Sequence, residues 1–487
     1  MQPANLLFIL SDQHSRNVLG CYGNPHVRTP NLDALAARGT RFESAYTNGP
    51  ICVPARASLA TGRYVHDIGC WDNAAPYDGA PRAWGHELMA AGHRVTCIGK
   101  LHYKDADSDT GFDEQLLPLH VVEGTGMLFH VLRDPVPTRP KTRELLIGAA
   151  AGESSYTQYD TQITERAVEW IEDSAGQTQN KPWALMVSLV APHPPYVAPQ
   201  RFHARYADAP LPAPRNAGLD TRPDHPALTG LRDFCGLQAP LDPAEDLEVA
   251  RAYYGLVSFL DDNVGQLVNA LERSGLADNT RIIYASDHGE SLGNQGLYGK
   301  SNFYEESVGV PMIMAGPDIQ KGYTARTPVS LLDLYPTFLH AMDLSPDATG
   351  EATPLPGHSL FDLALDEQLE RPVLSEQHSA GMPHAGFMLR YGRWKYVYYA
   401  GGLQPQLFDL HNDPDERFDL AAQPAHAQRL KELDAQLRTI VDPDEMDRRA
   451  KADQQRRLDL AGGAATVLGA GSLGYTPAPG EAPEYKR

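Results

Sequence analysis

The chain is poor in the features that mark secreted, membrane-spanning and nucleic-acid-binding proteins. It has only five cysteines in 487 residues, an odd and scattered set that excludes a disulfide scaffold. No apolar run approaches the length of a transmembrane helix, and the opening MQPANLLFIL lacks the basic segment and cleavage site of a signal peptide. The net charge of −20 disfavours nucleic acid and anionic membranes as partners. We therefore expect a cytoplasmic protein.

Short apolar runs alternate with helical patterns over the first 370 residues. The runs are typical of buried strands and lie at 5–10, 94–103, 183–193, 281–289 and 310–316. Helices are predicted between them, over 28–39, 52–62, 159–174 and 246–275. Strands separated by helices indicate parallel crossovers. We predict an α/β fold with a large, mostly parallel mixed sheet sandwiched by helices, forming a catalytic domain over 1–370.

The pattern changes after about residue 370. Aromatic-rich strand runs broken by Gly and Pro turns, followed by a helix with Leu433 and Leu437 on one stripe, predict a small antiparallel subdomain over 371–445. The tail over 446–487 ends in a Gly-, Ala- and Pro-rich stretch that cannot build a core alone. We expect this tail to be disordered or, as we favour, an oligomerisation arm in a homodimer or homotetramer.

Unusual polar residues fall at or just beyond the predicted carboxyl ends of the strands, which is the edge of a parallel sheet where ligands bind. Taken singly, each has an ordinary explanation as a helix cap or a turn residue. Their joint placement at one edge favours a functional site. They are Asp12, Gln13, Lys100, His102, His193, Asp287 and His288.

Cys52 stands where a helix begins, in the stretch ICVPARASLATGRY. The free amides of a helix N-terminus favour an anion or a thiolate. The residue is open to three interpretations: an inert buried side chain, a cysteine nucleophile, or the precursor of a modified residue. The carboxylates of Asp12 and Asp287, the His288 imidazole and the Gln13 amide form a mixed oxygen and nitrogen set suited to one divalent cation.

The segment CVPAR, residues 52–56, matches the C-x-P-x-R signature of the type I sulfatase family, part of the alkaline phosphatase superfamily. Further blocks resemble that family in the family's order along nearly the whole chain. They are ILSDQH, TPNLDALAARG, GKLHY, APHPPY, ASDHGE, YGKSNFYEESVGVPMI and LLDLYPTFL. An ordered set of this kind is far more specific than one five-residue motif.

The resemblance implies that a formylglycine-generating enzyme converts Cys52 to formylglycine, which hydrates to a diol. One hydroxyl, acidified on the metal, attacks the sulfur of a sulfate ester and forms a covalent sulfo-enzyme intermediate. The second hydroxyl then loses its proton and expels sulfate. The metal ligands implied by the family pattern are Asp12, Gln13, Cys52, Asp287 and His288.

The same resemblance assigns roles to the remaining side chains. Arg56 would hold the diol and support the metal site, while Lys100 and Lys300 would neutralise sulfate oxygens. His193, together with Lys300, would protonate the leaving oxygen, and His102 would be the base that opens the intermediate. One further residue, Asn73, resembles a pocket residue of nearer relatives, although a turn role explains it equally well.

Two departures from the broad family pattern concern the metal. Asp12–Gln13 and Asp287–His288 replace a carboxylate with an amide and add an imidazole, which favours Mn²⁺ and keeps Ca²⁺ as the alternative. These variations resemble a branch that contains phosphonate monoester hydrolases, phosphodiesterases, choline sulfatases and bacterial arylsulfatases. Lys100-x-His102 favours sulfate monoesters, because phosphonate hydrolases generally carry neutral residues there. We expect promiscuity towards phosphonate monoesters and phosphodiesters.

Two other classes of protein remain as alternatives. A two-metal phosphatase needs a Ser or Thr nucleophile and a second cluster of His and Asp ligands, which the corresponding blocks of this sequence lack. A non-catalytic anion-binding protein would not need Cys52, Arg56 and the complete polar set, which are costly to bury without use. We therefore predict an arylsulfatase-like hydrolase, with phosphonate monoester hydrolase or choline sulfatase as the alternatives.

Overall fold

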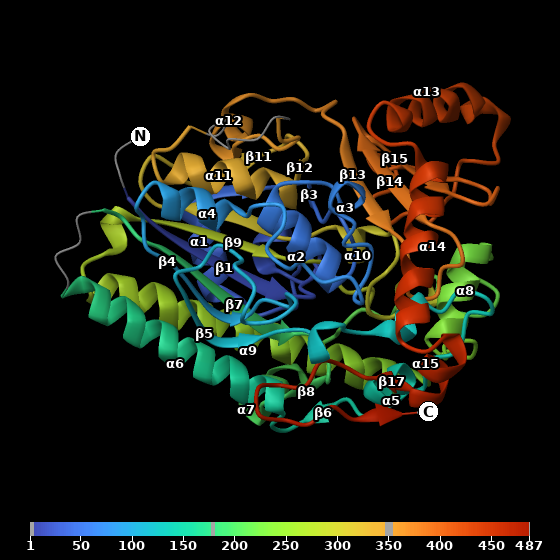
Figure 1. The fold of residues 1–487 in the computed structure, drawn as a ribbon, viewed down its shortest axis with the longest axis horizontal. Helices are drawn as coiled ribbons and strands as arrows, with labels where there is room; N and C mark the ends of the chain where they lie inside the picture. The colour runs from blue at the N-terminus through green and yellow to red at the C-terminus, as the bar shows by residue number, and fades with distance from the viewer. Residues whose placement is uncertain (1–3, 177–180, 346–353, 487) are drawn as a thin grey trace.

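An eight-stranded sheet runs through the centre of the protein, with helices against both faces (Figure 1). The computed structural model describes residues 4–176, 181–345 and 354–486. Along the sheet the strands are β11 (Tyr323–Ala325), β2 (Gly39–Phe42), β10 (Met312–Ala315), β9 (Thr280–Ser286), β1 (Asn5–Asp12), β7 (Ala184–Pro192), β4 (Val95–Lys100) and β5 (Glu114–Leu119). Only β10 is antiparallel to its neighbours in this sheet. The predicted mostly parallel mixed sheet is thus confirmed.

Strand β1 lies between β9 and β7 and is buried along its whole length. Its side chains alternate between the two faces of the sheet, so that Leu6 and Phe8 join one hydrophobic core while Leu7 and Ile9 join the other. One face is covered by α2 (Cys52–Thr61), α4 (Trp84–Ala90) and α11 (Leu334–Ala341), and the other by α1 (Pro30–Ala37), α6 (Ser155–Ala175) and α9 (Pro243–Arg273). Burial on both faces explains why β1 is apolar without alternation in its sequence.

The predicted helices occur, with small shifts at their ends. The helix expected over 159–174 begins earlier, because the Ser154 side chain accepts the backbone N–H of Thr157 and caps the first turn. The helix expected over 246–275 begins at Pro243 and runs for 31 residues. Strands β2, β5 and β11 were not predicted, because they are short or only partly buried and lack an apolar run.

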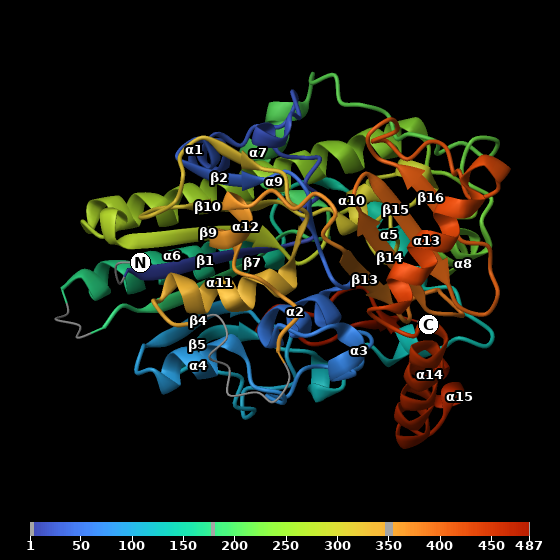
Figure 2. The same cartoon turned by 90° about the horizontal axis from the view of Figure 1, so that it is seen from above.

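A second, antiparallel sheet lies beside the main sheet (Figure 2). Its strands follow one another as β13 (Val373–Gln377), β14 (Gly386–Tyr391), β15 (Trp394–Tyr399) and β16 (Gln406–Asp409). Gly392 adopts a φ of 57° in the tight turn between β14 and β15, a conformation that glycine favours. Helix α13 (Ala427–Arg438) covers this sheet through Leu433 and Leu437, as the sequence predicts.

The C-terminal tail folds onto its own chain. Helix α14 (Pro443–Leu460) spans the boundary predicted between 445 and 446, and Nε2 of Gln454 donates to Oδ2 of Asp72 at 2.6 Å. Helix α15 (Ala464–Ala470) follows, and β17 (Ser472–Leu473) pairs with β18 (Tyr485–Lys486). Disorder is thus not observed in the described part of the tail. The role of the tail as an assembly arm stays a prediction.

The described chain also contains short α-helices and strands, besides several 3-10 helices. The helices are α3 (Val65–Ile68), α5 (Pro140–Ile147), α7 (Gln200–His203), α8 (Pro226–Phe234), α10 (Glu305–Val308) and α12 (Leu360–Leu365). The strands are paired as β12 (Val329–Ser330) with β3 (Ala45–Tyr46) and β6 (Ala150–Ala151) with β8 (Val197–Ala198). None of the described helices combines the length and the apolar character that crossing a membrane requires.

Candidate active site

The carboxyl ends of four neighbouring strands meet at one edge of the main sheet. Asp12 ends β1, and Asp287 directly follows β9, which pairs with β1 in parallel. Lys100 ends β4, and His193 directly follows β7, which lies between β4 and β1. The strand order therefore gathers at one edge the polar residues that the sequence places at separate strand ends.

Helix α2 brings the Cys52 thiol to the same edge. Its Sγ lies 3.2 Å from Nε2 of His288 and 3.0 Å from Nζ of Lys300. The backbone N–H of Val53 donates to Oδ1 of Asn73 at 3.0 Å, which satisfies one of the free amides at the start of the helix. Asn73 also lines the pocket above Cys52, although its side-chain oxygen is engaged by the helix.

Four buried side chains offer ligand atoms that all lie within 4.8 Å of one another: Asp12, Cys52, Asp287 and His288. Nδ1 of His288 lies 3.1 Å from the carbonyl oxygen of Gly289. A proton on Nδ1 would leave the lone pair of Nε2 facing the cluster, as in a metal-binding histidine. Two carboxylates and one imidazole fit a single divalent cation.

Gln13, the fifth predicted ligand, lies beside this cluster in a left-handed conformation with a φ of 70°. Its Oε1 accepts a hydrogen bond from Nζ of Lys300 at 2.8 Å, and its Nε2 donates to the Glu290 carboxylate. Its backbone N–H donates to Oδ1 of Asp287 at 3.1 Å. The amide oxygen of Gln13 is thus at the site and engaged by an ammonium group.

The Arg56 guanidinium lies buried between the two carboxylates of the cluster. It donates to Asp287 at 2.8 Å, to Asp12 at 3.1 Å, to the Lys100 carbonyl oxygen at 2.7 Å and to Oγ of Ser188 at 2.9 Å. Burial alone would lower the pKa of Arg56, but Asp287 and Asp12 raise it above its usual value. Arg56 therefore holds both carboxylates in place and balances their charge.

Asp12 is held in its ionised form by surrounding cations. Burial raises the pKa of its carboxyl group, but the charges of Lys100, Lys300 and Arg56 lower it well below the usual range. The nearest of these groups is Nζ of Lys100, 2.6 Å from Oδ2. An ionised carboxylate with no solvent exposure is suited to ligate a metal ion.

Two ammonium groups also act on the Cys52 thiol. Burial and the charge of Asp12 raise the pKa of this thiol, while Lys300, Lys100 and His288 lower it, and the net pKa is lowered. Cys52 is thus held in a positively charged recess, unlike Cys97, whose thiol pKa burial raises. The same recess would stabilise any anion placed against residue 52.

Two histidines lie around the recess in neutral form. Burial, followed by Lys100 and Arg56, lowers the pKa of His102 well below 6.5. Its Nε2 lies 2.8 Å from Oγ1 of Thr476, and its Nδ1 is buried without a hydrogen-bond partner among the described residues. Burial, followed by Lys300, likewise lowers the pKa of His193. A neutral imidazole at pH 7 can accept a proton.

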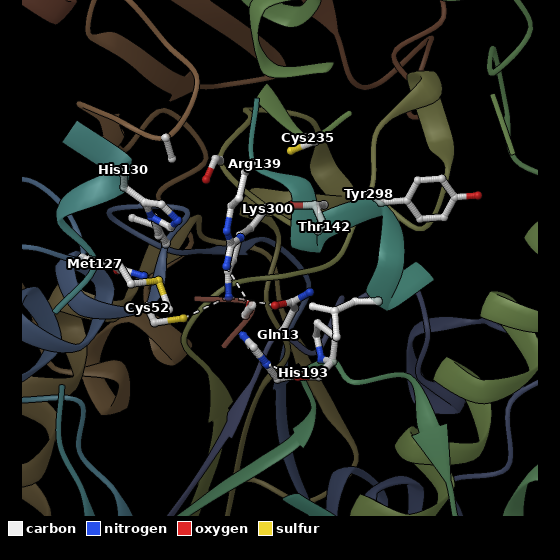
Figure 3. Close-up of a pocket in the computed structure, with 18 of the residues that line it drawn as sticks. Gln13, Cys52, Met127, His130, Arg139, Thr142, His193, Cys235, Tyr298 and Lys300 are labelled. Carbon is white, nitrogen blue, oxygen red and sulfur yellow. Dashed lines mark hydrogen bonds between the residues drawn. The ribbon is translucent and has the colours of Figure 1, made fainter. Parts of the chain in front are cut away.

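A pocket opens above these residues (Figure 3). Gln13, Cys52 and His193 lie at its base, and the Arg139 and Lys300 side chains point into it. Much of the remaining wall is apolar, and its residues include Ile51, Met127, Leu145, Leu146, Leu231 and Phe234. The structure thus brings all the predicted site residues to one region, although the catalytic and ligand roles assigned to them stay predictions.

Three residues of the site were missed in the sequence. Glu290 is buried and accepts hydrogen bonds from Gln13 and from the Tyr196 hydroxyl, at 2.8 Å in the second case. Its place directly after Asp287-His288-Gly289 was a usable signal. Arg139 and Thr476 gave no signal, because neither follows a predicted strand and both reach the pocket only through long-range folding.

Comparisons with known proteins place this chain in a family. The family model described as Sulfatase matches residues 4–344, and a model for the C-terminal part of N-sulphoglucosamine sulphohydrolase matches residues 293–442. The chain belongs to the sulfatase family. It is therefore assigned to the hydrolases of sulfuric esters, a family that generally uses a metal ion and formylglycine.

Curated relatives cover most of this sulfatase. A choline-sulfatase from Rhizobium meliloti (strain 1021) is 33% identical over 439 residues, covering 86% of this chain and 83% of the relative. Arylsulfatase K from Bos taurus is 30% identical over 470 residues, covering 90% and 81%.

Solved structures share the fold at lower identity. A phosphonate monoester hydrolase from Silicibacter pomeroyi has a TM-score of 0.71 at 22% identity, covering 89% of this chain and 94% of that chain. A protein solved with its substrate D-glucosamine-2-N,6-O-disulfate has a TM-score of 0.70 at 21% identity, covering 94% and 99%. These likenesses confirm the predicted alkaline phosphatase-like architecture.

Proposed function

We propose that this sulfatase hydrolyses organic sulfate monoesters in the manner of an arylsulfatase, with Cys52 converted to formylglycine and one divalent cation bound beside it. The observation that supports this proposal best is the position of Cys52. Its Sγ belongs to a cluster of ligand atoms within 4.8 Å of one another, and Nζ of Lys300 lies 3.0 Å away. A reacting group at residue 52 would thus lie between a metal site and a positive charge.

Asp12, Asp287 and His288 would hold the cation, together with residue 52 and the adjacent Gln13. When bound, the cation and hydrated formylglycine would supply an acidified hydroxyl as the nucleophile and a second hydroxyl whose deprotonation releases sulfate. A thiol or a serine lacks that second hydroxyl. The imidazole and the missing carboxylate favour Mn²⁺ over Ca²⁺. Maturation would require a formylglycine-generating enzyme as a partner.

The cationic side chains would bind and orient the sulfate. Lys300 already contacts Sγ of Cys52, and Lys100 lies 2.6 Å from Asp12, so both can reach oxygens of an ester held at residue 52. Preorganised cations in a buried site stabilise the charge that develops in the transition state. Arg56 would act on the metal ligands, because its guanidinium is engaged by Asp12 and Asp287.

The two histidines would move protons. The lowered pKa of His102 keeps it neutral and available as a base, and Thr476 orients its ring. His193 is also neutral, with Nδ1 2.6 Å from the Pro194 carbonyl oxygen. A bound sulfate would raise the pKa of His193, since an anion favours the protonated form, and would prepare it to protonate the leaving oxygen together with Lys300.

Phosphonate monoester hydrolysis is the second candidate function. The same cations and metal ligands fit a phosphonate or phosphodiester anion, and we propose such side activities. Lys100 and His102 favour sulfate as the main substrate. A two-metal phosphatase is a poorer fit, because the described residues hold one cluster of metal-ligating side chains, at Asp12, Cys52, Asp287 and His288.

The test combines mass and turnover. The peptide that spans Cys52 should show the mass change for replacement of the thiol by an aldehyde, and activity should scale with the modified fraction. Cys52→Ala should abolish turnover of 4-nitrophenyl sulfate while metal binding through Asp12, Asp287 and His288 persists. Full activity with an unmodified thiol, or a clear preference for an aryl phosphonate, would overturn the proposal. Binding without turnover in modified protein would indicate a non-catalytic role.

We further propose that the protein is a homodimer or homotetramer in which the tail over 446–487 contributes to assembly. Truncation after Gln455 should then lower the mass in solution, as measured by light scattering. Because the tail also contacts His102 through Thr476, loss of activity alone would not support this role. An unchanged oligomeric mass would contradict it.

A further inference from the structure

The pocket wall is positively charged although the whole chain carries a net charge of −20. Lys100, Arg139 and Lys300 line the pocket, and no Asp or Glu side chain of the described residues lines it. The two lysines at the base of the pocket contact residues of the candidate metal site or its neighbours. Lys100 pairs with Asp12, and Lys300 contacts Cys52 and Gln13.

Arg139 differs from these two lysines because no hydrogen bond or ion pair joins it to the residues of the metal cluster. It precedes α5, is partly exposed, and points into the pocket (Figure 3). Its guanidinium donates to the carbonyl oxygens of Leu473 and Gly474, at 2.6 Å each for Nη2. Its partners in the described part of the chain are thus neutral carbonyls, and no carboxylate there balances its charge.

His130, in the same wall, has no hydrogen-bond partner for its ring among the described residues. The residue is only 5% exposed, and both ring nitrogens lack such a partner. Burial, followed by Arg139 and Lys300, lowers the pKa of His130 well below 6.5, so it is neutral. Buried polar atoms are rarely left unpaired in proteins, which points to a ligand in this part of the pocket.

We propose that the substrate carries a second anionic group, a carboxylate or a second sulfate, which binds Arg139 with a further hydrogen bond from His130. This inference rests on the proposed function, in which the reacting sulfate lies against residue 52, Lys100 and Lys300. A guanidinium forms strong charge-assisted hydrogen bonds to planar or tetrahedral oxyanions. The apolar part of the pocket wall, between Cys52 and Arg139, would contact the carbon skeleton of the substrate.

The charge of this wall disfavours an ester of a cationic alcohol. A quaternary ammonium group is usually held by an aromatic cage or a carboxylate. Tyr156, Tyr196, Tyr298 and Phe234 line this pocket, but a cation there would meet the charge of Arg139, and no carboxylate among the described lining residues offsets that charge. Choline sulfate should therefore bind more weakly than a neutral sulfate ester of similar size.

Arg139 also holds the chain near Leu473 and Gly474, so a test must separate recognition from support of the tail. A purely structural role predicts that loss of Arg139 weakens binding of all sulfate esters alike. Recognition of a second anion predicts selective loss for dianionic esters. Paired probes that differ only in the second charge distinguish these outcomes.

The experiment measures binding to the full-length Cys52→Ala protein loaded with Mn²⁺, by titration calorimetry. The probes are phenyl sulfate, its three carboxyphenyl isomers, the phenylene disulfates and choline sulfate. At least one carboxylate or disulfate probe should bind about tenfold more tightly than phenyl sulfate, as expected for one charge-assisted contact. Which of the two series gains affinity identifies the second group.

Arg139→Gln should remove this gain while leaving the phenyl sulfate affinity within about twofold. Arg143→Gln is the matched control, because Arg143 lies on α5, donates to the Ala239 carbonyl oxygen at 2.8 Å and does not line the pocket. This control should keep every affinity. The inference is overturned if no probe binds, if no dianionic probe gains, if the gain survives in Arg139→Gln, or if that variant weakens phenyl sulfate equally.

Turnover of the same probes by modified wild-type protein separates the two proposals. Hydrolysis of phenyl sulfate without any preference for dianionic esters would contradict the second-anion inference and leave the proposed function intact. A binding preference that depends on Arg139, without hydrolysis of any sulfate probe, would contradict the proposed function and still support the anion site at Arg139.

Discussion

Oγ1 of Thr476 lies 2.8 Å from Nε2 of His102, although 374 residues separate them along the chain. The backbone near Thr476 is held by the Tyr156 hydroxyl, which donates to the Thr476 carbonyl oxygen at 2.5 Å. The C-terminal region thus forms part of the wall of the pocket. Through this contact it also orients the ring of the proposed base.

Thr476→Val should lower kcat for 4-nitrophenyl sulfate about three- to tenfold, because one hydrogen bond that orients His102 is lost. KM should change little, since Thr476 acts through His102. Thr476→Ser keeps the hydroxyl and should restore most of kcat, as steady-state kinetics would show. Equal kcat in the Val and Ser variants would mean that the hydroxyl does not position His102.

Arg56→Met should destabilise the metal-free protein by about 3–5 kcal/mol, because it leaves the Asp12 and Asp287 carboxylates buried without their guanidinium. Urea unfolding would measure this loss. Arg273→Met is the control, since Arg273 pairs with Glu172 at 2.8 Å on the surface, where such pairs contribute about 0–1 kcal/mol. Similar losses in the two variants would contradict the assigned role of Arg56.

Asp160 makes stability depend on pH. Its carboxyl group accepts the backbone N–H groups of Val190 and Ala191 at 2.7 Å each, just before His193. Burial raises its pKa to about 7, so the folded state binds more protons than the unfolded state between about 4 and 7. The contribution of Asp160 to the free energy of unfolding is therefore fully present below pH 4 and is lost as the pH rises towards 7.

Asp160→Asn should remove a slope of at most about 1.4 kcal/mol per pH unit from the free energy of unfolding in that window. Glu165→Gln, an exposed change on the same helix, is the control and should keep the wild-type slope. The measurement is urea unfolding at several pH values. A slope unchanged in Asp160→Asn would show that another group titrates there.

Removal of the metal should abolish turnover and lower the thermal midpoint, because buried carboxylates would face one another without the cation. Differential scanning calorimetry with and without a chelator would measure the shift. Mn²⁺ should restore activity better than Ca²⁺. In Asp287→Asn the chelator should have a smaller effect on the midpoint, and an equal shift would place the metal away from Asp287.

Much of the fold could be predicted because its signals are local. The apolar runs that became β1, β4, β7, β9 and β10 are continuous, since each strand is buried on both faces. Strand ends also marked the candidate site, because parallel strands share a carboxyl edge. Strand β5 was missed, since an edge strand that is only partly buried has no such run.

The sequence by itself determined five of the eight strands of the main sheet, the Cys52 motif and the polar residues at the strand ends, all of which depend on neighbours in the chain. Tertiary structure decided that Thr476 contacts His102, that Glu290 contacts Gln13 and that Arg139 faces the pocket without a carboxylate. Contacts between distant segments depend on how helices and loops pack over the sheet, and that packing leaves no periodic pattern in the sequence.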